Sequence, residues 1–365
     1  MMNLRNKKIV VVGLGRTGLA AARFLHQKGA RVLVADTADE TQLADSVRTL
    51  NELGVALELG PHRITSFQNA DLIVVSPGVS HTIEPIAQAS ALGIPLMSEV
   101  ELASRFIQEP IVAVTGTNGK TTTTELLGQM LKNSGISVFV GGNIGNPLIE
   151  YVDSAQKKQV VVAEISSFQL DTIDTFRPKV SVLLNITVDH LDRYPDFEAY
   201  ADSKIRVFNN QQADDVAVLN GSDPLIRAKT QEIKSQRLFF PSLEADEQGA
   251  VLNGKRIILN LNKLKRLQPE IRIPHSAINS IWISLKYAFG GGTILKMPVP
   301  PVWRRWRREQ PLKGSRKHWT ILRDWPTGWS RSRPSMGSTT TMTPKPPTWT
   351  VCSEHWILFQ NPFCC

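Results

Sequence analysis

The stretch that decides the fold is Ile111-Val-Ala-Val-Thr-Gly-Thr-Asn-Gly-Lys-Thr-Thr122, where a β-branched run ends in a glycine-bounded turn. A helical pattern follows directly over residues 123–132. Between a strand and a helix, such a turn points backbone N–H groups at phosphate oxygens, and the helix adds its positive N-terminal end. We therefore predict an ATP-binding turn, with Lys120 on the β- and γ-phosphates and the Thr121 hydroxyl on Mg²⁺. The predicted ATP-binding residues are Gly116, Thr117, Asn118, Gly119, Lys120, Thr121 and Thr122.

This turn is shorter than the usual pattern G-x-x-x-x-G-K-S/T, which would require glycine where Val114 stands. A glycine-rich turn with a solvated lysine is the simpler interpretation. The strand before the turn and the helix after it favour the phosphate site, because this context supplies the backbone donors and the helix dipole together.

Length and charge exclude several classes of protein. The chain has 365 residues, enough for two or three domains. No run approaches the ~18 apolar residues of a membrane-spanning helix, and the apolar run at residues 9–12 is too short for a secretory signal. The net charge of +9 does not indicate a nucleic-acid partner, because the excess of basic residues is confined to one end of the sequence. After residue 273 there are 13 of the 42 basic residues and only 3 of the 33 acidic ones. We expect a cytoplasmic protein with neither a nucleic-acid nor a membrane partner.

Short apolar strands alternate with helical patterns in two successive units, the rhythm of parallel, doubly wound sheets. The second unit begins at Ile111, and the boundary is expected near residues 104–110. The fold class is α/β, with a Rossmann-like domain at 1–103 and a central P-loop ATPase domain at 104–273. The other predicted strands are 8–13, 31–35, 71–76, 137–140, 159–164, 180–185 and 215–219; helices are predicted at 18–28 and 196–208, and a β-rich annex at 239–273 with a hairpin turn at Asn253-Gly254.

After Pro274 the sequence shows neither helical nor strand period, and all eight tryptophans fall between Trp282 and Trp356. A basic, aromatic tail of this kind would suit single-stranded nucleic acid. A shift of the reading frame explains the composition of this tail better. When the frame is shifted by one base, the codons of residues 341–350 permit the peptide Asn-Asp-Ser-Lys-Ala-Thr-Asn-Val-Asp. The remaining frame has a forced stop codon in the same stretch. We therefore expect residues 274–365 to be an out-of-frame, disordered tail.

The in-frame part, about residues 5–273, carries six motifs: Gly13-Leu-Gly-Arg-Thr-Gly18, Ser76-Pro-Gly78, Thr115-Gly-Thr-Asn-Gly-Lys-Thr-Thr122, Gly142-Asn-Ile-Gly145, Glu164-Ile-Ser-Ser-Phe-Gln-Leu170 and Asp189-His-Leu-Asp-Arg-Tyr194. Together they resemble those of the Mur ligases of peptidoglycan synthesis. The Ser-Ser-Phe-Gln run at 166–169 points to the members that add D-glutamate.

The resemblance implies a reaction. In the members that add D-glutamate, ATP phosphorylates the carboxylate of UDP-N-acetylmuramoyl-L-alanine, and the amino group of D-glutamate attacks the acyl phosphate. The expected ligands are these two substrates, ATP and Mg²⁺, and the expected state is a monomer. The family's third domain supplies adenine, D-glutamate and catalytic lysine contacts. It corresponds to the out-of-frame region, so little or no ligase activity is expected of the chain as written.

The resemblance also assigns roles to single residues. Glu164 ends an apolar strand, where a hard oxygen ligand suits Mg²⁺; His190 would contact a second metal, and Lys204 would hold Mg²⁺ as a carbamate. A surface glutamate, a structural histidine and a solvated lysine are the simpler interpretations. The expected catalytic residues are Lys120, Asn143, His190 and Lys204, and the expected metal ligands are Thr121, Glu164, His190 and Lys204.

Gly13-x-Gly15-x-x-Gly18, with Asp36 at the end of the next strand, is typical of a dinucleotide site. Alone it favours an NAD-dependent oxidoreductase, which is the alternative, although the separate ATP-binding turn argues against it. By resemblance this domain binds the UDP substrate, with Arg16 where the family often has an apolar residue and Ala38 where it often has a basic one. The candidate UDP-substrate contacts are Thr17, Asp36, Thr37, Ser76, Asn143 and Gln169.

Overall fold

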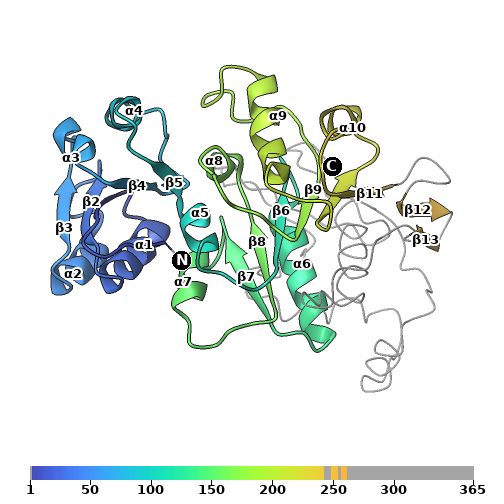
Figure 1. Cartoon of the computed structure of the whole chain (residues 1–365), viewed down its shortest axis with the longest axis horizontal. Helices are drawn as coiled ribbons and strands as arrows, with labels where there is room; N and C mark the ends of the chain where they lie inside the picture. The colour runs from blue at the N-terminus through green and yellow to red at the C-terminus, as the bar shows by residue number, and fades with distance from the viewer. Residues whose placement is uncertain (1, 242–247, 254–255, 261–365) are drawn as a thin grey trace, which may run out of the picture. The chain divides into compact units, whose positions relative to one another are not determined.

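The computed structural model describes residues 2–241, 248–253 and 256–260 (Figure 1). The predicted tail at 274–365 and Gly254 of the predicted hairpin turn lie outside these residues. The described strands form two sheets, one from residues 8–98 and one from residues 111–260. None of the described helices is long and apolar enough to span a membrane.

The first sheet and its helices are β1 (Lys8–Val12), α1 (Arg16–Gln27), β2 (Arg31–Asp36), α2 (Ala44–Glu52), β3 (Ala56–Leu59), α3 (Ile64–Gln68), β4 (Leu72–Val75), α4 (Glu84–Ala91), β5 (Leu96–Ser98) and α5 (Glu99–Ser104). The sheet is parallel, in the order β3-β2-β1-β4-β5. Val11 and Val34 share a core with α1 and α2, whereas Val12 and Ala35 share one with α3 and α4. Because both faces are covered, the central strands are continuously apolar.

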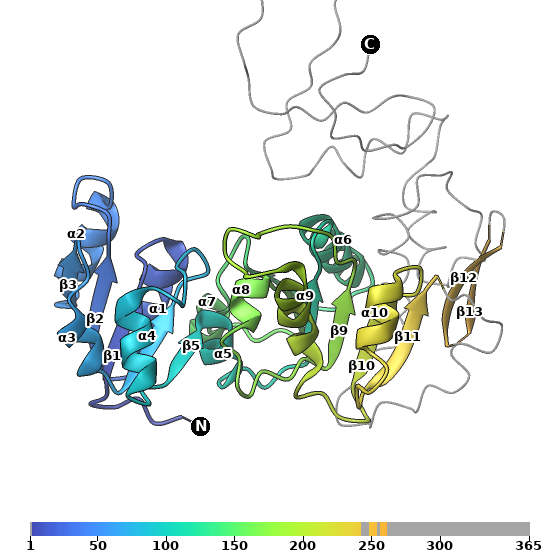
Figure 2. The same ribbon diagram turned by 90° about the horizontal axis from the view of Figure 1, so that it is seen from above.

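The second sheet and its helices are β6 (Ile111–Thr115), α6 (Lys120–Asn133), β7 (Val138–Gly142), α7 (Leu148–Asp153), β8 (Val160–Glu164), α8 (Ser167–Leu170), β9 (Val180–Leu183), α9 (Phe197–Ile205), the 3₁₀ turn Arg206–Phe208, β10 (Val216–Asn220), α10 (Pro224–Lys229), β11 (Gln236–Phe240), β12 (Gly249–Asn253) and β13 (Arg256–Asn260). Their order is β13-β12-β11-β10-β9-β6-β8-β7, and β6 to β11 pair in parallel. Leu127 and Leu131 of α6 pack on one face, and α8 and α9 pack on the other (Figure 2).

All the predicted strands up to residue 219 are confirmed, to within two residues at their ends. Within the predicted β-rich annex the structure has β12 and β13, which extend the second sheet beyond β11. Residues 261–273 of the annex lie outside the described residues. α6 begins at Lys120, three residues earlier than predicted, because Gly119 adopts a left-handed conformation at its N-cap. The domain division after residue 103 falls within α5 and stays a prediction.

A buried carboxylate ties α5 to the loop before β9. Glu101 is fully buried, and its oxygens accept the backbone N–H groups of Asp174, Thr175 and Phe176 at 3.0, 3.1 and 2.9 Å. Arg105 Nε donates to the same carboxylate at 2.7 Å. Burial opposes ionisation, but hydrogen bonds from Thr175, Asp174 and Arg105 outweigh it and hold the pKa of Glu101 below its ordinary value.

Candidate functional site

The predicted ATP-binding turn leaves the carboxyl end of β6 and leads into α6 (Figure 1). Gly116 has a φ of +148°, and a Cβ there would lie 2.9 Å from Leu184 Cβ; Gly119 has a φ of +81°. Both positions need glycine, because side chains are strained at these angles. Thr121 and Thr122 are exposed on the first turn of α6, whose N–H groups have no partner within the helix. The turn therefore has the glycine conformations and the open helix start that the predicted phosphate site requires.

The segment after β9 holds this turn through two residues that the sequence analysis missed. Asn185 Oδ1 accepts the N–H of Asn118 at 2.9 Å, and Asn185 Nδ2 donates to the Asn118 carbonyl at 3.0 Å. The Thr187 N–H donates to Thr117 Oγ1 at 3.0 Å. An amide residue directly after a buried strand was the available signal, but it identifies the partner only once β9 is known to lie beside β6.

Lys120 and Lys204, both predicted to be catalytic, meet at one oxygen atom. Lys120 Nζ donates to the carbonyl oxygens of Gly116 and Thr117, at 3.0 and 2.8 Å. Lys204 Nζ, from α9, donates to the Gly116 oxygen at 2.9 Å across 88 residues of sequence, and its side chain is buried. The fold thus brings two cationic groups to the turn where the phosphates are predicted.

This crowding changes the acidity of both lysines. Burial and, after it, the charge of Lys120 lower the pKa of Lys204 to about 7, although Asp189 and Asp171 oppose the change. Burial also lowers the pKa of Lys120, with Glu164 and Asp189 opposing it. At neutral pH, a substantial part of Lys204 is therefore the neutral amine, the nucleophilic form.

Glu164 ends β8, as predicted, in a buried position. Its Oε1 accepts Asn143 Nδ2 at 3.2 Å, whereas its Oε2 is buried and has no hydrogen-bond partner among the described residues. Gly142 has a φ of +111°, and a Cβ there would lie 2.3 Å from the Glu164 carbonyl oxygen, so glycine lets the Asn143 loop approach. A buried carboxylate oxygen without a partner is a place for a cation or a donor.

His190 and Lys204 lie on the same aromatic ring, that of Tyr200. The His190 ring centroid is 5.9 Å from that of Tyr200 and 4.9 Å from that of Phe168, and Lys204 Nζ is 4.6 Å from the Tyr200 centroid. No three His, Cys, Asp or Glu side chains gather as a metal site in the described part of the chain. The fit to Mg²⁺ therefore depends on the unpaired oxygen of Glu164, with Lys204 adding oxygens only as a carbamate.

Gln169 has a structural role that the sequence did not show. Its Oε1 accepts the N–H and the hydroxyl of Ser166, at 2.9 and 3.1 Å, in a capping box at the start of α8. Its Nε2 is buried without a hydrogen-bond partner in the described structure. The Nε2 atom of Gln169 is thus available to donate a hydrogen bond to a ligand.

The glycine fingerprint lies at the carboxyl end of β1. Gly13 has a φ of +92°, and a Cβ on Gly18 would lie 1.8 Å from the Gly13 oxygen, so close packing of α1 requires both glycines. Ser76 Oγ donates to the Gly13 oxygen at 3.0 Å. Asp36 accepts the N–H groups of Leu14 and Ala38, at 2.6 and 2.8 Å, and so holds the turn.

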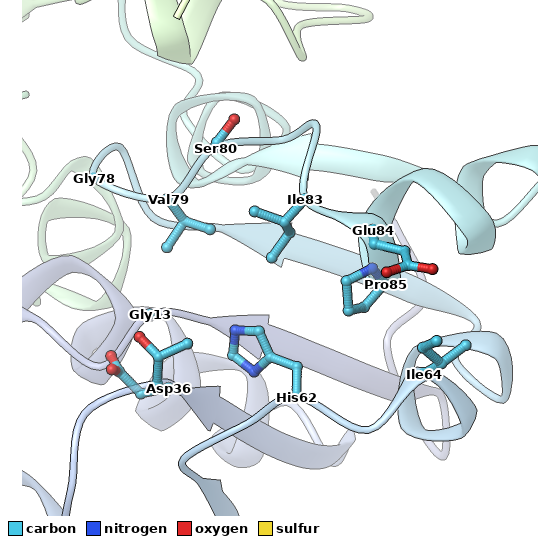
Figure 3. Close-up of a pocket in the computed structure, with 11 residues that line it drawn as sticks. Gly13, Asp36, His62, Ile64, Gly78, Val79, Ser80, Ile83, Glu84 and Pro85 are labelled. Atoms are coloured by element: carbon cyan, nitrogen blue, oxygen red, sulfur yellow. The ribbon is translucent and has the colours of Figure 1, made fainter. Parts of the chain in front are cut away.

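A pocket opens beside this turn, with a volume of about 470 Å³ (Figure 3). Asp36 and Thr37 line it, while Thr17, on the first turn of α1, and Ser76 are not among its lining residues. The pocket lies at the carboxyl ends of β1 and β2, where ligands of doubly wound sheets bind. Its other lining residues are Gly13, His62, Ile64, Gly78, Val79, Ser80, Ile83, Glu84 and Pro85.

The chain has two α/β sheets, one with a glycine fingerprint and one with a predicted phosphate-binding turn. This arrangement defines a class of nucleotide-binding proteins, and comparison with known proteins identifies the family within that class. Residues 7–98 match the Mur ligase MurD-like N-terminal domain, and residues 114–274 match the Mur ligase middle domain. The chain belongs to the Mur ligase family through these two domains.

Curated relatives of the chain are UDP-N-acetylmuramoylalanine--D-glutamate ligases. The one from Desulfatibacillum aliphaticivorans is 57% identical over 253 residues, which are 69% of this chain and 56% of the relative. The one from Desulfosudis oleivorans is 55% identical over 252 residues, 69% of this chain and 55% of the relative. A solved UDP-N-acetylmuramate:L-alanyl-gamma-D-glutamyl-meso-diaminopimelate ligase from Neisseria meningitides is 18% identical, with a TM-score of 0.46, over 80% of this chain and 99% of that one. The chain spans little more than half the length of the curated relatives it matches.

Proposed function

We propose that this chain carries the nucleotide-substrate site and the ATP site of a ligase that joins D-glutamate to UDP-N-acetylmuramoyl-L-alanine, using ATP, in peptidoglycan precursor synthesis. The observation that carries the proposal is the meeting of Lys120 and Lys204 at the Gly116 oxygen, in a turn between a parallel strand and a helix. Membership of the family and the names of the relatives supply the reaction.

In the proposed reaction the alanyl carboxylate attacks the γ-phosphorus of ATP, which gives an acyl phosphate and ADP. The amino group of D-glutamate then attacks the acyl carbon, and phosphate leaves with the bonding electrons. Lys120 and the N–H groups at the start of α6 neutralise the charge on the phosphoryl oxygens, which is the main task of an enzyme in phosphoryl transfer. Asn143 and Gln169 orient the substrate, the latter through its unpaired Nε2.

Mg²⁺, when bound, would neutralise further charge on the phosphates. Glu164 would hold it through its unpaired Oε2, together with Thr121, His190 and Lys204. Lys204 gains oxygen atoms when its neutral amine attacks CO₂, which forms an N–C bond and releases a proton to leave a carbamate anion. The pKa of about 7 supports this step, because the amine is uncharged in a large fraction of molecules at neutral pH.

The first sheet would bind the UDP part of the substrate. Asp36 and Ser76 support the turn after β1, and Thr37 lines the pocket beside it. The proposal also includes a domain division between residues 103 and 104, a cytoplasmic location and a monomeric state. The full set of proposed UDP-substrate contacts is Thr17, Asp36, Thr37, Ser76, Asn143 and Gln169.

Binding and turnover test the proposal separately. In calorimetry with a non-hydrolysable ATP analogue and Mg²⁺, we expect binding that weakens about tenfold or more in Lys120→Ala, since a charge-assisted contact is lost. Lys132→Ala, an exposed lysine near the end of the same helix, is the matched control and should bind as before. Absence of binding by the unchanged chain would contradict the ATP site.

Transfer of labelled D-glutamate to UDP-N-acetylmuramoyl-L-alanine then measures the reaction. Binding without transfer agrees with an out-of-frame region at 274–365, whereas turnover near that of an intact ligase contradicts it. Resequencing codons 265–365 from independent template decides the frame directly: a gained or lost base is expected. The oxidoreductase alternative predicts a change in NADH fluorescence on adding the protein, and we expect none.

A further inference from the structure

The pocket of the first sheet contains a side chain with no role so far, His62, in the loop between β3 and α3. Figure 3 shows its imidazole standing across the pocket from Val79 and Ile83, with Gly13 and Asp36 to one side. The buried ring of Phe67 meets it edge-on, with centroids 5.4 Å apart and an interplanar angle of 61°. Phe67 therefore supports the His62 ring within the pocket wall.

The two ring nitrogens of His62 have different surroundings. Nδ1 is buried and has no hydrogen-bond partner among the described residues. A buried N–H without an acceptor is more costly than a bare lone pair, so the neutral ring carries its proton on Nε2. The nitrogen that remains for the pocket is therefore an N–H donor, which needs an acceptor oxygen or nitrogen from a ligand.

The lining of the pocket selects an uncharged, flat group. No lysine or arginine is among its described lining residues, and the carboxylates of Asp36 and Glu84 are, so phosphate groups are disfavoured there. Val79 and Ile83 offer apolar contact to the face of a ring. Ligand pockets commonly combine apolar walls with a few placed polar groups, in volumes of ~300–1,000 Å³. The base of a nucleotide fits this description better than its diphosphate.

We propose that His62 is a substrate-positioning residue whose Nε2–H donates a hydrogen bond to a carbonyl oxygen of the uracil base. Uracil is flat and uncharged and has two carbonyl oxygens, so it meets both requirements of the pocket. The inference rests on the proposed function, because the base is that of the UDP substrate. With the base held here, the diphosphate can reach the glycine turn at Gly13 and the N-terminus of α1.

Three variants of the full chain test the donor atom. The amide nitrogen of glutamine can take the place of Nε2, asparagine reaches only as far as Nδ1, and leucine keeps bulk without a donor. In calorimetry with UDP-N-acetylmuramoyl-L-alanine, we expect His62→Leu and His62→Asn to bind about tenfold more weakly and His62→Gln to stay within about threefold. His26→Leu, on α1 and not lining this pocket, is the control and should bind normally. Binding of the ATP analogue and the unfolding temperature confirm that each variant is folded.

The outcomes separate this inference from the function on which it rests. No binding of the UDP substrate by the unchanged chain overturns the proposed function and the role of His62 with it. Normal binding by the unchanged chain and by His62→Leu overturns the role of His62 alone. Equal weakening in the glutamine and leucine variants, or rescue by asparagine instead of glutamine, overturns donation from Nε2.

Discussion

Lys120 and Lys204 donate to the same carbonyl oxygen, that of Gly116, at 3.0 and 2.9 Å. Two ammonium groups on one acceptor repel each other, and burial strengthens the effect because little water screens them. Burial and, after it, the charge of Lys120 lower the pKa of Lys204 to about 7, whereas Lys120 has a second acceptor at the Thr117 carbonyl. A phosphate bound at the turn would relieve the same conflict.

The first prediction concerns the carbamate of Lys204. With ¹³C-labelled bicarbonate at pH 7.5, a carbamate carbon signal should appear by NMR in the unchanged chain and vanish in Lys204→Met. In Lys120→Met the signal should weaken, because removing the neighbouring positive charge raises the pKa of Lys204 and leaves less neutral amine. Lys229→Met, which removes a half-buried lysine paired with Glu198 and Asp202, should leave the signal unchanged. A signal that persists in Lys204→Met would place the carbamate elsewhere.

The second prediction is a change of stability with pH, measured in CO₂-free buffer. The pKa of Lys204 is about 7 in the folded chain and 10.5 as the reference value, so between these pH values the unfolded chain binds more protons. The free energy of unfolding should therefore rise with pH across this window. Lys204→Met should remove that slope, so the variant should gain most stability at or below pH 7 and least near pH 10.5. An equal gain in denaturant midpoint at both ends would show that Lys204 does not titrate in this way.

The third prediction tests the anchor of the ATP-binding turn. Asn185→Ala removes both hydrogen bonds to Asn118 and leaves its N–H and carbonyl unpaired. We expect a loss of about 1–2 kcal/mol in the free energy of unfolding and binding of the ATP analogue weakened about tenfold. Asn51→Ala, exposed on α2, should change neither quantity. If ATP binding stays the same in a folded Asn185→Ala chain, the turn holds its shape without this anchor.

The fourth prediction concerns the buried carboxylate of Glu101. Glu101→Gln places a neutral amide opposite the N–H groups of Asp174, Thr175 and Phe176, so we expect a loss of about 2–3 kcal/mol at pH 7. The pKa of Glu101 is below its reference value of 4.5, so its contribution is complete above that pH and is lost as the pH falls further. The difference between the two chains, from urea unfolding, should shrink below pH 4.5. Glu52→Gln, exposed on α2, is the control; a difference that does not depend on pH would argue against an ionised Glu101.

The sequence predicted the central strands because they are buried on both faces and read as continuous apolar runs. It missed β5, whose three residues are too short to show a pattern, and β3, which is at most partly buried and so lacks a long apolar run. It predicted the ATP-binding turn because the glycines, Lys120 and the helix lie within one short segment. These features are local in the chain, and local patterns are what a single sequence shows well.

The contacts that complete the site depend on strand order, which no local pattern contains. Asn185 reaches Asn118 because β9 pairs with β6 although five elements separate them along the chain. Asp36 was predicted as a ligand contact from its place in the fingerprint, and the structure shows that both of its oxygens already accept backbone N–H groups. His62 gave no signal, because a lone histidine in a loop has no pattern to read. Long-range pairing decided the case of Asn185.

The pairing of β6 with β9 also sets an order of events during synthesis of the chain. A ribosome that has released residues 111–133 has made the whole motif and its helix, but neither Asn185 nor Thr187 is yet present to hold the turn. Lys204 arrives later still, and with it the second amine at the Gly116 oxygen. Nascent chains that end before residue 185 should therefore carry the signature of an ATP site and fail to retain the nucleotide, so the motif and the site are made at different times.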